Sequence, residues 1–136
     1  MVENVAPRHA WDRLKSDPEA RLVDVRTEAE WNFVGVPDLG EAGKEAVLIP
    51  WQGYPDGRVN GRFVEDLRAA GVAEGAAVFF LCRSGGRSLA AARAAEAAGY
   101  KRAFNVAGGF EGPQDEAGHR GGVGGWKAEG LAWRQG

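Results

Sequence analysis

Short apolar runs alternate with amphipathic segments along the chain. Runs typical of buried strands occur at residues 21–25, 47–49, 76–81 and 102–106. The run at 76–81 (AAVFFL) has no polar residue, as expected for a strand that is covered on both faces. Segments with helical spacing lie at residues 7–15, 28–31, 61–70 and 87–98. This alternation predicts an α/β fold with a mostly parallel central sheet between layers of helices.

Local signals mark the ends of several predicted helices. Thr27 and Glu30 form the sequence of a capping box, which predicts a short helix that begins after Thr27 and continues to Trp31. Asn60 is placed to cap the next helix, which we expect to end before Gly71. Gly99 follows the last predicted helix and is a typical residue to end it.

Two stretches have no pattern of a regular element. Residues 35–44 are polar and glycine-rich, and residues 118–125 (GHRGGVGG) are richer still in glycine, so we expect the second stretch to be mobile. Trp126, Leu131 and Trp133 follow it and could dock back on the body. We therefore expect one domain over residues 5–116, with a C-terminal extension over residues 117–136 that docks on it.

The composition is that of a soluble domain with one core. The chain has 136 residues, of which 44% are hydrophobic and 26% charged, and both signs of charge are spread along it to a net charge of −2. No basic patch for nucleic acid is evident, no apolar run approaches the length of a membrane span, and the N-terminus lacks the apolar core of a signal peptide. We expect a cytoplasmic protein with no nucleic-acid or membrane partner.

The single cysteine is the strongest candidate for chemistry. One cysteine excludes an internal disulfide, and the two histidines, His9 and His119, have no metal-binding spacing, so we expect no metal and no cofactor. Cys82 directly follows the most apolar predicted strand and precedes a Gly-Gly pair and a helix. Ligands of parallel sheets bind where strands end, so Cys82 is expected at the ligand-binding edge.

The loop after Cys82 has the chemistry of an anion-binding site. Gly85 and Gly86 allow positive φ angles, so that successive N–H groups can point inward. The helix start adds unpaired N–H groups, and Arg83 and Arg87 add positive charge. Such a setting favours the thiolate of a cysteine. We therefore expect Cys82 to be the catalytic residue and the substrate- and anion-binding loop to comprise Arg83, Ser84, Gly85, Gly86, Arg87 and Ser88.

Three motifs resemble those of the rhodanese family of sulfurtransferases. Residues 82–88 (CRSGGRS) resemble its active-site loop, residues 24–26 (DVR) with Glu30 and Trp31 resemble a second signature, and residues 105–110 (NVAGGF) a third. They follow the family's order, and the resemblance covers residues 5–133. Residues 35–40 (GVPDLG) depart from the family because they lack the histidine of a GHIPGA segment, so no role is transferred to them.

The resemblance implies a fold and a reaction. The fold is a three-layer α/β/α sandwich. In the reaction, Cys82 takes a sulfane sulfur from a small anionic donor such as thiosulfate, holds it as a persulfide, and passes it to a thiophilic acceptor. The acceptor could be cyanide, a small thiol or a cysteine of a partner protein. Asp24, Arg26 and Glu30 are expected to support the site through a hydrogen-bonded ion pair.

Other interpretations stay open at this stage. Cysteine-based phosphatases and arsenate reductases also have a Cys-to-Arg loop at a helix start, but it is one residue longer. The shorter loop between Cys82 and Arg87 suits one sulfur better than a tetrahedral oxyanion. The chain could also be a rhodanese-like sulfur carrier or interaction module that serves a protein partner. Cys82 could, finally, be a buried structural cysteine.

Overall fold

The structure is a computed structural model that describes residues 2–53 and 56–135. Within these residues the strands form a five-stranded parallel sheet in the order β1-β6-β5-β2-β4. The strands are β1 (Glu3–Val5), β2 (Arg21–Asp24), β4 (Val47–Leu48), β5 (Val78–Leu81) and β6 (Ala103–Val106). The helices are α1 (Pro7–Ser16), α2 (Glu28–Phe33), α3 (Phe63–Ala69) and α4 (Gly86–Ala97), with a short 3-10 helix at Gly40–Ala42.

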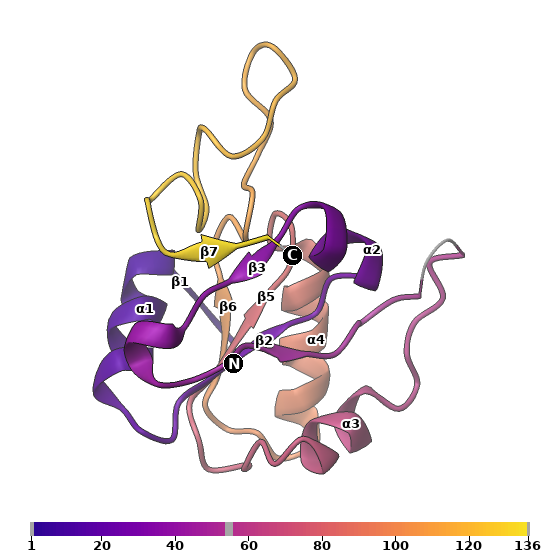
Figure 1. Cartoon of the computed structure of the whole chain (residues 1–136). Coiled ribbons are helices and arrows are strands. Elements are labelled where there is room, and N and C mark those ends of the chain that lie inside the picture. The colour runs from indigo at the N-terminus through magenta and orange to yellow at the C-terminus, as the bar shows by residue number, and fades with distance from the viewer. Residues whose placement is uncertain (1, 54–55, 136) are drawn as a thin grey trace.

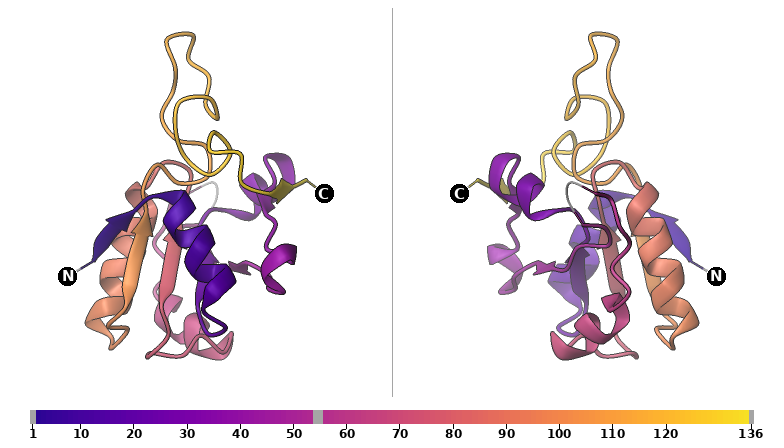
Figure 2. Two further views of the ribbon diagram at one scale, coloured as in Figure 1. Left: turned by 90° about the vertical axis from the view of Figure 1, so that its left-hand side faces the viewer. Right: turned by 90° about the vertical axis from the view of Figure 1, so that its right-hand side faces the viewer.

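The sheet separates two apolar clusters, which makes the fold a three-layer α/β/α sandwich (Figures 1 and 2). One cluster contains Phe63 and Leu67 of α3 and Ala92 of α4, and the other contains Trp11 of α1. All four residues of β5 are buried because they alternate between these clusters. The predicted fold class and the parallel central sheet are confirmed.

Several predicted element bounds were wrong. The strand predicted at residues 47–49 is a two-residue edge strand, and Leu48 is 43% exposed because no strand covers its outer side. Asn60 does not cap α3, which begins at Phe63. Asn60 instead accepts a hydrogen bond from the Arg62 amide and donates to the Pro50 carbonyl, so it fixes the turn before the helix.

The chain also forms strands that the apolar pattern did not predict. β1 pairs in parallel with β6 at the edge of the main sheet. The polar stretch at residues 35–44 contains β3 (Val36–Pro37), which pairs with β7 (Trp133–Arg134) in a small antiparallel sheet. The expectation that this stretch has no regular element was therefore wrong.

The C-terminal segment has one exposed part and one packed part. Residues 113–124 form turns that extend away from the sheet (Figure 1). Trp126 and Leu131 then return to the apolar cluster around α1 and are buried, whereas Trp133 is 41% exposed. The division into a domain and an extension stays a prediction. None of the described helices is long and apolar enough to cross a membrane.

Candidate active site

A strand, a tight loop and a helix place Cys82. The residue follows β5 directly, and α4 begins at Gly86. Gly85 caps the helix with a φ angle of +119°, which glycine adopts without strain. Gly86 was also expected to use a positive φ angle, but it does not, because it already belongs to the helix. One glycine therefore makes the turn.

The sulfur of Cys82 lies at the base of this loop. Cys82 is 1% exposed, and its Sγ accepts a hydrogen bond of 3.1 Å from the Gly85 amide. The Oγ of Ser88, a buried residue on the first turn of α4, lies 3.2 Å from Sγ. Among the described residues, the amides of Gly86, Arg87 and Ser88 have no acceptor, as expected for a helix start. The sulfur is thus buried beside polar donors rather than among apolar groups alone.

Residues 109–112 hold the loop from behind. The Phe110 amide donates to the Cys82 carbonyl over 2.8 Å, and the Glu111 amide donates to the Arg83 carbonyl over 2.9 Å. Gly109 packs so closely that a Cβ there would meet the Cys82 carbonyl oxygen and lie 2.7 Å from the Arg83 carbonyl. The third motif of the sequence therefore supports the loop, a role that sequence reasoning did not assign to it.

Asn105 connects the loop to the sheet. Its Oδ1 lies 2.5 Å from Ser88 Oγ, and its Nδ2 donates to the Gly85 carbonyl and, over 2.8 Å, to Asn4 Oδ1 of β1. Asn105 is 4% exposed. Sequence reasoning missed this contact, although the asparagine of the third motif was the signal that could have found it.

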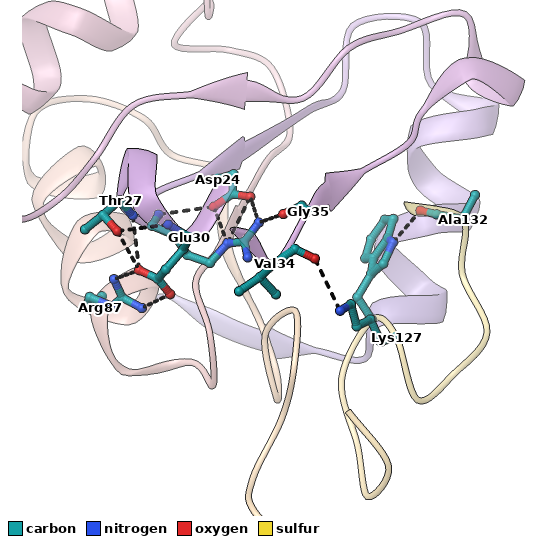
Figure 3. Close-up of polar contacts among 10 residues, drawn as sticks. Asp24, Thr27, Glu30, Val34, Gly35, Arg87, Lys127 and Ala132 are labelled. Carbon is teal, nitrogen blue, oxygen red and sulfur yellow. Dashed lines mark hydrogen bonds and ion pairs between the residues drawn. The ribbon is translucent and has the colours of Figure 1, made fainter. Parts of the chain in front are cut away.

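Asp24 and Arg26 form the expected ion pair. Both side chains are fully buried, and Arg26 donates to Asp24 through Nε and, over 2.7 Å, through Nη2. Nη2 also donates to the Gly35 carbonyl (Figure 3). The guanidinium lies 4.2 Å from the centre of the Phe110 ring. Since Asp24 pairs with Leu81 across β2 and β5, this ion pair lies beside the cysteine strand.

Glu30 joins a different ion pair from the one expected. It accepts from both terminal nitrogens of Arg87, over 2.7 and 2.9 Å, and it completes the predicted capping box with Thr27 (Figure 3). Burial raises the pKa of Glu30, but hydrogen bonds and charge from Arg87 and hydrogen bonds from Thr27 outweigh it and lower the pKa below its ordinary value. The Glu30 hydrogen bond in turn raises the pKa of Arg87. A cation at a helix start is unfavourable, and Glu30 compensates it.

The other predicted loop residues face solvent. Arg83 and Ser84 are exposed, and within the described part of the chain the Arg83 side chain has no ion pair or hydrogen bond. Arg83 and Arg87 line a pocket of about 600 Å³, together with Thr27, Ala29, Glu30, Phe33, Val34, Gln52, Gly53 and Gly57. Phe33 is 80% exposed at this pocket. The pocket thus has a cationic end at the loop and an apolar wall on α2.

Comparison with known proteins identifies the family. A family model described as the STR4 middle domain matches residues 2–136. The chain belongs to this rhodanese-like family. It is similar to Rv0390, a protein of Mycobacterium tuberculosis with a known crystal structure, and the two sequences are 50% identical. The two structures superpose with a TM-score of 0.91 over 99% of this chain and 98% of Rv0390.

Two further relatives differ in length. An uncharacterized protein of Rickettsia conorii, RC0915, is 37% identical over 133 residues, which are 98% of both chains. The chloroplastic protein named THYLAKOID RHODANESE-LIKE from Oryza sativa subsp. indica is 32% identical over 130 residues, which are 95% of this chain but 24% of the rice protein. The rhodanese-like domain therefore occurs at this length and within a larger protein.

In this rhodanese-like domain, the C-terminal segment holds the pocket wall. Two carbonyls at the end of α2 accept hydrogen bonds from side chains of that segment: Phe33 O from Gln135 over 2.8 Å, and Val34 O, just after the helix, from Lys127 over 3.4 Å. Figure 3 shows the contact between Lys127 and Val34. Trp126 Nε1 donates to the Ala132 carbonyl and so fixes the fold of the segment itself. Residues from the end of the chain thus cap a helix that lines the site.

Proposed function

We propose that this rhodanese-like domain is a sulfurtransferase that carries sulfur on Cys82. It moves a sulfane sulfur from an anionic donor such as thiosulfate to a thiophilic acceptor. The observation that carries this proposal is the position of Cys82 Sγ, within 3.1 Å of the Gly85 amide and beside the unpaired amides that begin α4. A helix start with free amides stabilises an anionic sulfur.

The transfer has two balanced steps. The Cys82 thiolate attacks the outer sulfur of thiosulfate, the sulfur–sulfur bond of the donor breaks, and sulfite leaves with the electron pair. The product is a persulfide whose terminal sulfur is anionic. The acceptor then attacks that terminal sulfur, and the Cys82 thiolate is released. The amides of Gly86, Arg87 and Ser88 stabilise the negative charge in both steps.

The two arginines have different parts in this mechanism. Arg87 is paired with Glu30, so its charge is largely compensated and its side chain helps to fix α4 against α2. Arg83 is exposed and has no counter-ion among the described residues, so it attracts the anionic donor. Asp24 and Arg26 support β2 beside the loop and have no contact with substrate in this mechanism.

The pocket favours a large acceptor as a second candidate. A pocket of about 600 Å³ far exceeds the size of thiosulfate or cyanide, and its wall exposes Phe33. These features fit a sulfur carrier that serves the cysteine of a partner protein. In that case thiosulfate is one usable donor, and the persulfide on Cys82 is the same intermediate.

Intact-mass spectrometry tests the proposal directly. After incubation with thiosulfate, the protein is expected to gain the mass of one sulfur atom, and cyanide is expected to remove it. Cys82→Ser, which is nearly isosteric, is expected to gain nothing. An unchanged mass of the wild-type chain with thiosulfate and with polysulfide would contradict the proposal. Turnover of an aryl phosphate that is lost in Cys82→Ser would favour the phosphatase interpretation instead.

A further inference from the structure

The hydrogen atoms around Ser88 determine what its hydroxyl offers to the cysteine. Asn105 Nδ2 has two hydrogens, and both are used, toward Asn4 Oδ1 over 2.8 Å and toward the Gly85 carbonyl over 3.2 Å. The Oδ1 of Asn105 is therefore an acceptor. Since it lies 2.5 Å from Ser88 Oγ, the single hydroxyl hydrogen of Ser88 points to Asn105.

This arrangement leaves a lone pair of Ser88 facing the sulfur. Ser88 Oγ lies 3.2 Å from Cys82 Sγ and 3.2 Å from the Gly85 carbonyl oxygen, but Asn105 Oδ1, at 2.5 Å, is its nearest acceptor and takes its only hydrogen. The hydroxyl can then accept from the S–H group of the thiol, and it offers no hydrogen to a thiolate. All three residues are buried, which strengthens such contacts.

We infer that Asn105 is a positioning residue that acts through Ser88: it holds the Ser88 hydroxyl in the orientation that presents a lone pair, and not a hydrogen, to the sulfur of Cys82. It opposes the amides of the loop, which favour the thiolate. When the thiol loses its proton to solvent, the Ser88 hydroxyl must break its hydrogen bond to Asn105 before it can donate to the sulfur.

The inference rests on the proposed function for its catalytic meaning, but its test needs no sulfur donor. The ultraviolet absorbance of the thiolate is followed against pH, with Cys82→Ser as the blank, and the single cysteine makes the signal unambiguous. The ionised groups near the loop stay unchanged in the variants, so they contribute equally; they are Asp24, Arg26, Glu30, Arg83, Arg87 and Glu111.

Two variants are expected to move the midpoint of thiolate formation. In Asn105→Ala the Ser88 hydroxyl has two acceptors left at 3.2 Å, the Gly85 carbonyl and the sulfur, and it should donate to the thiolate because a charged acceptor forms the stronger hydrogen bond. The midpoint should then fall by about one pH unit, the size of one hydrogen bond to a charged group. Ser88→Ala removes the lone pair that faces the sulfur, so its midpoint should also fall. Asn4→Ala is the matched control, because it removes one contact of Asn105 but keeps the contact with Ser88, and its midpoint should not move.

The double variant separates positioning from loosening of the loop. If Asn105 acts through Ser88, Asn105→Ala should have no further effect in the Ser88→Ala background. An equal shift on Asn105→Ala in the wild type and in Ser88→Ala would overturn the inference. A higher midpoint in the Ser88→Ala single variant would also overturn it, because it would show that Ser88 donates to the thiolate while Asn105 is still in place. Failure of these shifts alongside persulfide formation by the wild type would leave the proposed function intact.

Discussion

Gly109 is the position where the support of the cysteine loop can be tested most sharply. Gly109 has a φ angle of +62°, which costs any other residue about 1–2 kcal/mol. In Gly109→Ala the new Cβ would also lie 2.7 Å from the carbonyl carbon and oxygen of Arg83, whereas ordinary contact begins at 3.4 Å. The backbone after Cys82 must therefore move by more than half an ångström. Displacements of about 1 Å at a reacting centre can lower rates about a hundredfold.

Gly118→Ala is the matched control. Gly118 also has a positive φ angle, +79°, but its Cβ would meet no atom within 4 Å. The control should lose about 1–2 kcal/mol in urea denaturation and keep its activity. Gly109→Ala should lose more stability and lower kcat/KM for thiosulfate about ten- to a hundredfold. Equal kcat/KM in the two variants would refute the argument that Gly109 shapes the loop.

Three further predictions concern charges. Asp24→Asn should lower the free energy of unfolding by about 3–5 kcal/mol in urea denaturation, because it leaves the Arg26 guanidinium buried without its carboxylate. Lys44→Met should lower the free energy of unfolding by about 2–3 kcal/mol. The Lys44 ammonium donates to three carbonyls at 2.6–2.8 Å, those of Leu14, Asp17 and Ala20, and so it holds the end of α1 and the turn after it. The pKa of Glu30 is lowered in the folded state, so its pairing with Arg87 should stabilise the fold above the ordinary value of 4.5 and lose this effect as the pH falls below it. The difference in unfolding free energy between wild type and Glu30→Gln, measured against pH, should therefore shrink on acidification.

The sequence predicted those parts of the site that local signals determine. The apolar run of β5, the turn glycine and the start of α4 are continuous in the chain, so their pattern placed Cys82 correctly at the edge of the sheet. The capping box of α2 was predicted for the same reason, since Thr27 and Glu30 are three residues apart.

Contacts between distant segments could not be predicted in this way. Glu30 was expected beside Asp24 and Arg26, but its partner is Arg87, 57 residues away. Asn4 and Asn105 are 101 residues apart, and β1 is too short and too polar to give an apolar pattern of its own. A short edge strand such as β1 forms because it pairs with a neighbouring strand, here β6. Which side chains this pairing brings together is visible only in the assembled sheet.

The pairing of charges also determines what can stabilise an anionic sulfur here. The Asp24–Arg26 pair is neutral as a unit, and so is the Glu30–Arg87 pair. The positive potential at the loop then comes from the exposed Arg83 and from the amides that begin α4. Salt screens an exposed charge far more than it screens hydrogen bonds to a buried sulfur. Dissolved salt should therefore weaken the encounter with an anionic donor, while the stabilisation of the persulfide, which the backbone provides, should change little. This division explains why a single glycine turn and a helix start matter more to the proposed chemistry than the number of arginines around them.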